Sequence, residues 1–264
     1  MSLKIAVIGA SGRMGRAVVR LATEQGLQVV CAVGEGSEGR DAGELAGVGA
    51  IGICVTSDLG TLGASGAEVA IDFSSADLVS ELAPLCASSG IALVSGTTGL
   101  DAEAQLAIQG ASSDVAVLWE PNMSVGVHVL GLLLEKAIAS LGIGFDVEIV
   151  ETHHRDKLDA PSGTGRKLFE IARRARGEKD SVISGREGKT GRRPEREIGV
   201  LAVRGGDVVG DHQVHLLGVG ERIELTHRAT SRDLFAQGSV RAAIWIAGRT
   251  AGAYSLADVL GSPS

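Results

Sequence analysis

The chain has 264 residues, 44% of them hydrophobic, which is enough apolar material for one large folded domain or two modest ones. Its formal net charge of -7 at pH 7 argues against a nucleic-acid partner, because phosphate backbones are bound by clustered positive charge. The longest apolar runs, such as residues 125–134, are too short to cross a bilayer, and the N-terminus runs directly into a strand instead of a signal peptide. We therefore expect a cytoplasmic protein with no membrane contact.

The first half of the chain alternates short apolar strands with helical patterns. Strands are predicted at residues 4–8, 28–33, 67–73, 92–95 and 115–119, and helices at 13–25, 77–88 and 102–109. Apolar strands that alternate with helices in this way predict a parallel sheet covered on both faces. The fold class expected here is α/β, with a Rossmann-type parallel sheet.

A strongly apolar helix over residues 124–141, with Asn122 or Ser124 as its N-cap, leads into a second region. Strands are predicted there at 145–153, 198–203, 208–217 and 222–228, and helices at 163–176 and 231–250. Glycine turns join the last strands, which is typical of antiparallel pairing. The second region is therefore expected to be α+β, with a mostly antiparallel open sheet.

The three cysteines, Cys31, Cys54 and Cys86, are an odd number and lie in apolar stretches. We interpret them as buried free thiols of a reducing compartment and not as a disulfide framework. No pair has the spacing of zinc ligands, so no metal site is expected.

A glycine-rich loop follows the first predicted strand and opens a helix. It runs through Gly9, Ala10, Ser11, Gly12, Arg13, Met14 and Gly15. Glycines allow the backbone to lie against a pyrophosphate, and the helix start supplies free N–H groups and a positive dipole end. Glu35 follows the second strand, where an acid binds ribose hydroxyls. A tight turn beside a surface acid is the alternative, but strand, loop, helix, strand and acid in this order favour a dinucleotide site.

The most informative stretch runs from Glu151 to Gly165, at the end of a predicted strand. Its cations His154, Arg155 and Lys157 precede a helix start whose amides, over residues 162–165, form an anion site. Such a combination suits a carboxylate, or two. A polar strand end followed by a capped helix is the plainer alternative.

These residues resemble those of the 4-hydroxy-tetrahydrodipicolinate reductase (dihydrodipicolinate reductase) family, which acts in the diaminopimelate route of lysine biosynthesis. The likeness covers nearly the whole chain, and the run from His153 to Thr164 is its most specific part. The resemblance implies an oxidoreductase that transfers a hydride from NADH or NADPH to a small cyclic dicarboxylate, with loss of water. It also implies a homotetramer built through sheets of the second domain.

Site roles are carried over from the family by matching position. The resemblance makes His153 the general acid and Lys157 a proton donor or electrostatic stabiliser, with His154 as a substrate contact. Ser162, Gly163, Thr164 and Thr98 would hold the substrate carboxylates. The nucleotide cleft would include Gly12, Arg13, Met14, Phe73, Gly96, Thr97, Thr98, Pro121, Asn122 and Met123.

The sequence departs from the family pattern near the second strand. Gly34 stands where an acid often ends that strand, and Ser75 stands where a basic residue sometimes follows Phe73. Glu35 should repel a 2′-phosphate, but Arg13 and Arg40 are close enough in sequence to offset it. Both NADH and NADPH are therefore candidate cofactors.

We expect a dinucleotide-binding domain over residues 1–124, to which residues 233–264 return, and a substrate-binding and tetramerisation domain over residues 125–232. Three other functions are alternatives. An amino-acid dehydrogenase of Rossmann type, such as aspartate dehydrogenase, would not need the carboxylate cradle of Lys157–Thr164. A non-catalytic NAD(H) sensor or a structural α/β module would have no use for the stretch His153–Thr164.

Overall fold

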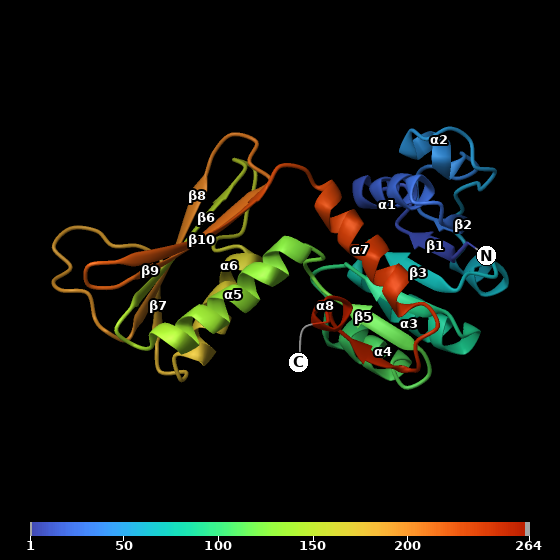
Figure 1. The fold of residues 1–264 in the computed structure, drawn as a ribbon. Coiled ribbons are helices and arrows are strands. Elements are labelled where there is room, and N and C mark those ends of the chain that lie inside the picture. The colour runs from blue at the N-terminus through green and yellow to red at the C-terminus, as the bar shows by residue number, and fades with distance from the viewer. Residues whose placement is uncertain (1, 262–264) are drawn as a thin grey trace. The chain divides into compact units, whose positions relative to one another are not determined.

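The structure is a computed structural model that describes residues 2–261. The chain divides into two compact units, one within residues 1–124 and 233–264 and one of residues 125–232 (Figure 1). Each unit has its own sheet and its own hydrophobic core.

The first unit is built on a six-stranded sheet in which every pairing is parallel. Its strands, in spatial order, are β11 (Gly252–Tyr254), β5 (Ala116–Trp119), β4 (Ala92–Ser95), β3 (Val69–Asp72), β1 (Lys4–Ile8) and β2 (Gln28–Val33). The chain order reverses at β1, so the ends of β1, β3 and β4 meet at one edge, where ligands of such sheets bind.

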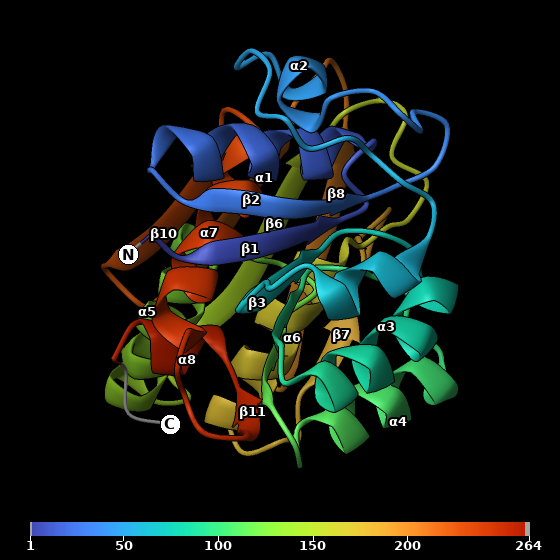
Figure 2. The same ribbon diagram turned by 90° about the vertical axis from the view of Figure 1, so that its right-hand side faces the viewer.

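Alternate side chains of these strands enter two separate cores. One core packs beneath α1 (Arg13–Glu24), α7 (Asp233–Ile246) and α8 (Leu256–Val259). The other packs beneath α3 (Ala76–Ser89), α4 (Ala102–Ala111) and the 3-10 helix η1 (Leu59–Ala64). Figure 2 shows α3 and α4 together, with α7 and α8 in another layer. The strands are apolar on both faces because helices cover both.

A short helix, α2 (Ala42–Ala46), follows β2 and is held by one carboxylate. Asp41 accepts hydrogen bonds from the amides of Gly43 and Glu44 at the helix start and from those of Ile51 and Gly52. Asp41 thus acts both as the N-cap of α2 and as a tie to the returning chain.

The second unit has a mixed five-stranded sheet. In spatial order its strands are β10 (Arg222–Ala229), β9 (Gly210–Leu217), β6 (Asp146–His153), β8 (Glu197–Arg204) and β7 (Ser181–Ile183). The pairs β10–β9 and β9–β6 are antiparallel, whereas β6–β8 and β8–β7 are parallel.

Two helices, α5 (Val125–Leu141) and α6 (Gly163–Ala175), cover one face of this sheet. Their apolar residues pack on inward-facing residues of β6, β8 and β9, such as Ile149, Val200 and Val214. The opposite face carries alternate residues of the same strands, among them Val150, Leu201 and Val203. Within unit 2, none of the described helices contributes to the core on that face.

The expected fold class is confirmed: a Rossmann-type parallel sheet and a second, mixed sheet of α+β character. The short elements α2, η1, β7, β11 and α8 were not predicted. The expectation that all three cysteines are buried is wrong for Cys54, which is exposed because its segment crosses the surface of unit 1 and pairs only through an isolated bridge to Asp41. Among the described residues, no helix is long and apolar enough to span a membrane.

Candidate active site

The glycine-rich loop joins β1 to α1 at the switch point of the first sheet. The N-cap of α1 is Gly12, whose lack of a side chain leaves the first amides of the helix without a side-chain cap. Gly9 has φ +80°, and a Cβ there would overlap the carbonyl of Phe73. A Cβ at Gly15 would overlap the carbonyl of Gly9. Glycine is therefore required at both positions to keep the loop tight and the helix start open.

The departure at Gly34 has a steric reason. A Cβ at this position would lie 2.5 Å from Ser11 Oγ and 2.8 Å from the Ser11 amide nitrogen, so only glycine lets the end of β2 approach the loop. Ser11 Oγ is itself buried and lacks a hydrogen-bond partner among the described residues. Glu35, next along the chain, is exposed. An orphaned hydroxyl in an open loop, beside an exposed acid, fits a dinucleotide that supplies the missing partner.

A buried carboxylate fixes the two neighbouring turns. Asp72, at the end of β3, has no exposed surface and accepts hydrogen bonds from the hydroxyls of Ser74, Ser95 and Thr97. The Thr97 carbonyl also accepts the indole N–H of Trp119 at 2.9 Å. The hydroxyl of Thr97 is therefore used inside the protein, whereas Thr98, next to it, is exposed.

The other residues expected in the nucleotide cleft differ in how open they are. Phe73 packs so closely on Gly96 that a Cβ on Gly96 would overlap its ring. Pro121 is exposed and Asn122 is half-buried, with its side-chain oxygen accepting the amide of Ser124. Met123 is 1% exposed and belongs to the core of unit 1, so its side chain is not placed to meet a ligand.

The second cluster lies at the end of β6 in unit 2. Glu151 and His153 are two residues apart and so point to the same face of the strand. Nδ1 of His153 lies 2.9 Å from Oε2 of Glu151, and the Glu151 side chain is completely buried. His212, on β9, meets the His153 ring edge-on at 5.2 Å between centroids. His153 is thus held between a carboxylate and a second imidazole.

Burial and neighbouring groups together determine the charge states of Glu151 and His212. Burial alone would raise the pKa of Glu151, but the contacts from His153, Ser162 and Arg204 outweigh it and hold that pKa well below its usual range. Burial, with the charge of His153, lowers the pKa of His212 to about 4. His212 is therefore neutral near pH 7, and Glu151 is ionised.

The loop after β6 brings the remaining cations. Lys157 Nζ lies 2.7 Å from a carboxylate oxygen of Asp159, which lowers the pKa of Asp159. His154 is half-buried, and its Nε2 lies 3.4 Å from the Arg232 guanidinium. Arg155 is exposed. Lys157 and His154 are thus held by ion pairs or polar contacts within unit 2.

The start of α6 follows this loop. Ser162 Oγ accepts the amide of Gly165 as the N-cap, and the Ser162 amide donates to Glu151 at 3.0 Å. Ser162 is only 2% exposed, whereas Gly163 is exposed and Thr164 half-buried. The part of the helix start that faces outward therefore consists of Gly163 and Thr164.

Glu151, His153 and His212 each offer a ligand atom within 4.8 Å of the others, which is the spacing of a metal site. The Arg204 guanidinium lies 2.8 Å from Glu151 Oε1 and compensates its charge. A cation bound beside it would meet this fixed positive charge. We therefore interpret Glu151 and His153 as a carboxylate–imidazole pair and not as metal ligands.

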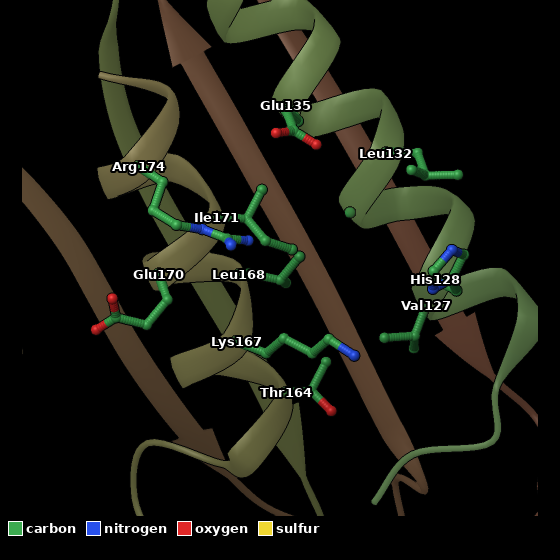
Figure 3. Close-up of a pocket in the computed structure, with 11 residues that line it drawn as sticks. Val127, His128, Leu132, Glu135, Thr164, Lys167, Leu168, Glu170, Ile171 and Arg174 are labelled. Atoms are coloured by element: carbon green, nitrogen blue, oxygen red, sulfur yellow. The ribbon is translucent and has the colours of Figure 1, made fainter. Parts of the chain in front are cut away.

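A separate pocket of about 210 Å³ lies between α5 and α6 (Figure 3). Its apolar lining includes Val127, Leu132 and Ile171, with Glu135 and Arg174 among the charged residues. It is lined by residues Val127, His128, Gly131, Leu132, Glu135, Thr164, Lys167, Leu168, Glu170, Ile171 and Arg174. His153 and Lys157 are not among them, so this pocket is distinct from the cluster at the end of β6.

Sequence reasoning assigned no site role to Asp72, Glu151, Arg204 or His212, and His212 was interpreted as structural. Glu151 and His153 alternate on one strand, a signal visible in the sequence, although the expected site was centred on the cations that follow it. Arg204 pairs with His153 in the strand register and His212 with Glu151. Their proximity to Glu151 and His153 follows from the pairing of β6 with β8 and β9, which local sequence patterns do not show.

Comparison with known proteins identifies relatives along the whole chain. Residues 3–123 match the family model described as dihydrodipicolinate reductase, N-terminus, and residues 126–260 match that described as dihydrodipicolinate reductase, C-terminus. A 4-hydroxy-tetrahydrodipicolinate reductase of Anaeromyxobacter sp. (strain Fw109-5) is 50% identical, with 98% of each chain covered. One of Myxococcus xanthus is 47% identical, also with 98% of each covered.

Solved structures give the same fold. A dipicolinate-bound dihydrodipicolinate reductase from Paenisporosarcina sp. TG-14 superposes with a TM-score of 0.77 at 23% identity, covering 97% of this chain and 98% of the other. An amine dehydrogenase from Mycobacterium smegmatis superposes with a TM-score of 0.60 at 14% identity, covering 96% and 95%. At these identities the superpositions speak to architecture alone.

Proposed function

The chain belongs to the dihydrodipicolinate reductase family, and from this we propose that it reduces 4-hydroxy-tetrahydrodipicolinate to tetrahydrodipicolinate with NADH or NADPH, in diaminopimelate and lysine biosynthesis. The observation that carries the proposal is the match of both family models and of curated relatives over nearly the whole chain. The cluster at the end of β6 supplies the groups that such a reduction needs.

Unit 1 is the proposed nucleotide-binding domain. Its loop Gly9–Gly15 would hold the pyrophosphate on the open start of α1, where Ser11 Oγ still needs a partner. Glu35 would accept the ribose hydroxyls, and the turn holding Phe73 and Gly96 would face the nicotinamide. When bound, the nicotinamide supplies the hydride; the protein residues bind and orient it.

Unit 2 is the proposed substrate domain. The exposed amide of Gly163 and the hydroxyl of Thr164 suit one carboxylate, and Lys157 and His154 add positive charge beside them. Loss of water from the hydroxylated ring leaves a conjugated imine. Hydride addition to a ring carbon displaces an electron pair, and His153 would donate the proton that the electron pair takes up.

The reaction is tested by a coupled assay. Substrate is generated by the preceding synthase in the presence of this protein, and the loss of absorbance of NADH and of NADPH is compared. We expect oxidation of both, because Glu35 disfavours a 2′-phosphate while Arg13 and Arg40 compensate. Binding of nucleotide without its oxidation would instead support a sensor and overturn the proposed activity.

We also propose a homotetramer that acts in the cytoplasm, where reduced nicotinamide nucleotides are available. The support is the sheet face of unit 2 that carries Val150, Leu201 and Val203, with Val203 48% exposed. Apolar strand residues on a face without helices are typical of surfaces that pair with another copy.

A further inference from the structure

Glu151 occupies a position that the proposed reaction does not yet explain. It is one of the few ionisable side chains with no exposed surface, and it lies directly behind His153. Its Oε1 accepts the amide of Ser162 at 3.0 Å and the Arg204 guanidinium at 2.8 Å, while its Oε2 lies 2.9 Å from His153 Nδ1. A single carboxylate therefore connects the proposed acid to the N-cap of the helix that would hold the substrate.

We propose that Glu151 is a positioning residue, which sets the proton on the His153 ring and fixes the start of α6 relative to that ring. This inference rests on the proposed function, since it assumes that His153 is the proton donor. It concerns a residue that touches His153 and Ser162 and is itself buried away from any ligand.

The proton on the ring follows from which atoms can donate. A carboxylate oxygen and an unprotonated imidazole nitrogen are both acceptors and repel each other when buried at 2.9 Å. Oε2 of Glu151 and Nδ1 of His153 lie 2.9 Å apart, and neither makes a well-aligned hydrogen bond with any of the described residues. A proton on Nδ1 relieves both atoms, and it leaves Nε2 as the nitrogen that accepts and delivers the catalytic proton.

The space around Nε2 is consistent with this assignment. A Cβ at Gly210 would lie 3.0 Å from Nε2, so the ring edge is packed against a residue that has no side chain. The ring is thus held from behind by Glu151, at its edge by Gly210 and on one side by His212. A ring fixed in this way has little freedom to turn over and exchange its two nitrogens.

The charged and titratable groups around Glu151 come from every packed element. Arg204 approaches from β8, His212 from β9 and His227 from β10, and Lys157 lies on the loop after β6. Neutral His212 lies 4.0 Å from Glu151 Oε2 and does not compete with His153 for its negative charge. Arg204 compensates Oε1, which leaves Oε2 for the imidazole.

The first test is Glu151→Gln in the full-length enzyme. The glutamine oxygen can still accept the Ser162 amide, but its NH₂ group would donate to Nδ1 of His153 and so move the ring proton to Nε2. We expect kcat to fall about a hundredfold or more, the size of a general-acid contribution, with an unchanged Kd for NADH and a smaller change in KM. The pH profile of kcat should also change, because His153 has lost its anionic neighbour.

The matched control is Glu170→Gln, which removes a surface carboxylate paired with Arg173 in the same unit. It should leave kcat and its pH profile unchanged. Equal activity of Glu151→Gln and Glu170→Gln would overturn the positioning role. If the unaltered enzyme itself oxidised no NADH with the substrate, the proposed function would fail instead, and the two failures are thereby told apart.

The second test needs no substitution. ¹⁵N spectra of the histidine-labelled enzyme at pH 8 report which ring nitrogen of His153 carries the proton, with His153→Gln used to assign the signal. We expect the proton on Nδ1. A proton on Nε2 in the unaltered enzyme would overturn the inference whatever the activity of the variants.

Discussion

At the scale of single residues, the environment of His153 separates two imidazoles that lie 5.2 Å apart. His153 has a carboxylate at 2.9 Å, whereas His212 has one only at 4.0 Å. Burial then keeps His212 neutral, with its pKa lowered to about 4. The two histidines lie on the same face of the sheet but differ in role. His153 lies beside the carboxylate and is the proposed proton donor, whereas His212 is a buried, neutral side chain.

The acid role of His153 is tested by His153→Gln. We expect kcat to fall about a hundredfold or more, because a proton donor is removed, while NADH binding stays as it was. Steady-state kinetics and NADH fluorescence titration measure the two effects. Parallel losses in kcat and in NADH affinity would contradict the assigned role.

The neutral state of His212 makes the stability of unit 2 depend on pH. The folded pKa of about 4 lies below the ordinary value of 6.5, so between these values the unfolded chain binds a proton that the folded one does not. Stability is therefore lost as pH falls from about 6.5 towards 4, by an amount on the order of 3 kcal/mol. The loss is complete near pH 4 and absent above pH 7.

The corresponding measurement is the free energy of unfolding of His212→Gln against pH. We expect the variant to be less stable than the unaltered protein at pH 7 and to lose less stability on acidification. His215→Gln, on the opposite face of β9, is the control and should keep the full pH dependence. A parallel pH dependence of unaltered protein and His212→Gln would contradict this assignment.

At this scale the sequence identifies the chemical groups better than their partners. The cations after β6 and the capped start of α6 are visible as a local string, because they are consecutive in the chain. Arg204 and His212 are distant in sequence from Glu151, and their approach depends on strand register. Long-range pairing of this kind cannot be obtained from local spacing.

At the scale of elements, the segment before β8 is held to the sheet by three carboxylates, those of Asp146, Glu148 and Glu197. Glu148, on β6, binds both Arg186 and Arg193, and Arg193 also donates to the backbone carbonyls of Val147 and Glu197. Burial would raise the pKa of Glu148, but the two arginines lower it on balance. Gly199 lies beside this carboxylate, and a Cβ there would overlap it.

Gly199→Ala should therefore displace Glu148 and release the segment that holds Arg186 and Arg193. Overlap of this kind costs about 1–3 kcal/mol, and we expect faster tryptic cleavage after Lys189 and Arg192. Gly185→Ala is the control, since a Cβ there meets nothing within 4 Å. Equal cleavage rates for the two variants would show that the segment does not depend on this clamp.

Long, strongly patterned elements were predicted well and short ones were not. The apolar helix α5 and the strands β1, β2 and β6 lie within a residue or so of their expected bounds. The three-residue strands β7 and β11 are too short to show a period of two, and they exist because a neighbouring strand offers its edge. Helix α2 depends on the capping carboxylate of Asp41 more than on any apolar stripe.

At the scale of the whole molecule, the proposed homotetramer depends on the open face of the second sheet. Val203→Glu would place a charge on that face, near the end of β8, and burying it in an interface would be costly. We expect light scattering after size-exclusion chromatography to show species smaller than a tetramer. Leu106→Glu, at a 66% exposed leucine of unit 1, is the control and should leave the assembly intact.

A tetramer unchanged by Val203→Glu would place the contact elsewhere on the molecule.

The fold class itself was predictable, because strand and helix periods differ and the change of pattern after residue 124 is plain in the sequence. The proposed pairing surface could not be predicted from periodicity, since Val150, Leu201 and Val203 have the pattern of core residues and only the structure shows that no helix of unit 2 packs on them.

The return of the chain to the first unit has a consequence for its synthesis. Strand β11 pairs with β5, and α7 packs against α1, so the first sheet and one of its covering layers need residues that follow the second unit in the chain. The second unit, in contrast, is continuous in sequence. On the ribosome, all strands of the inserted unit are therefore synthesised before the first sheet can be completed, and loss of residues 252–254 would remove an edge strand of that sheet.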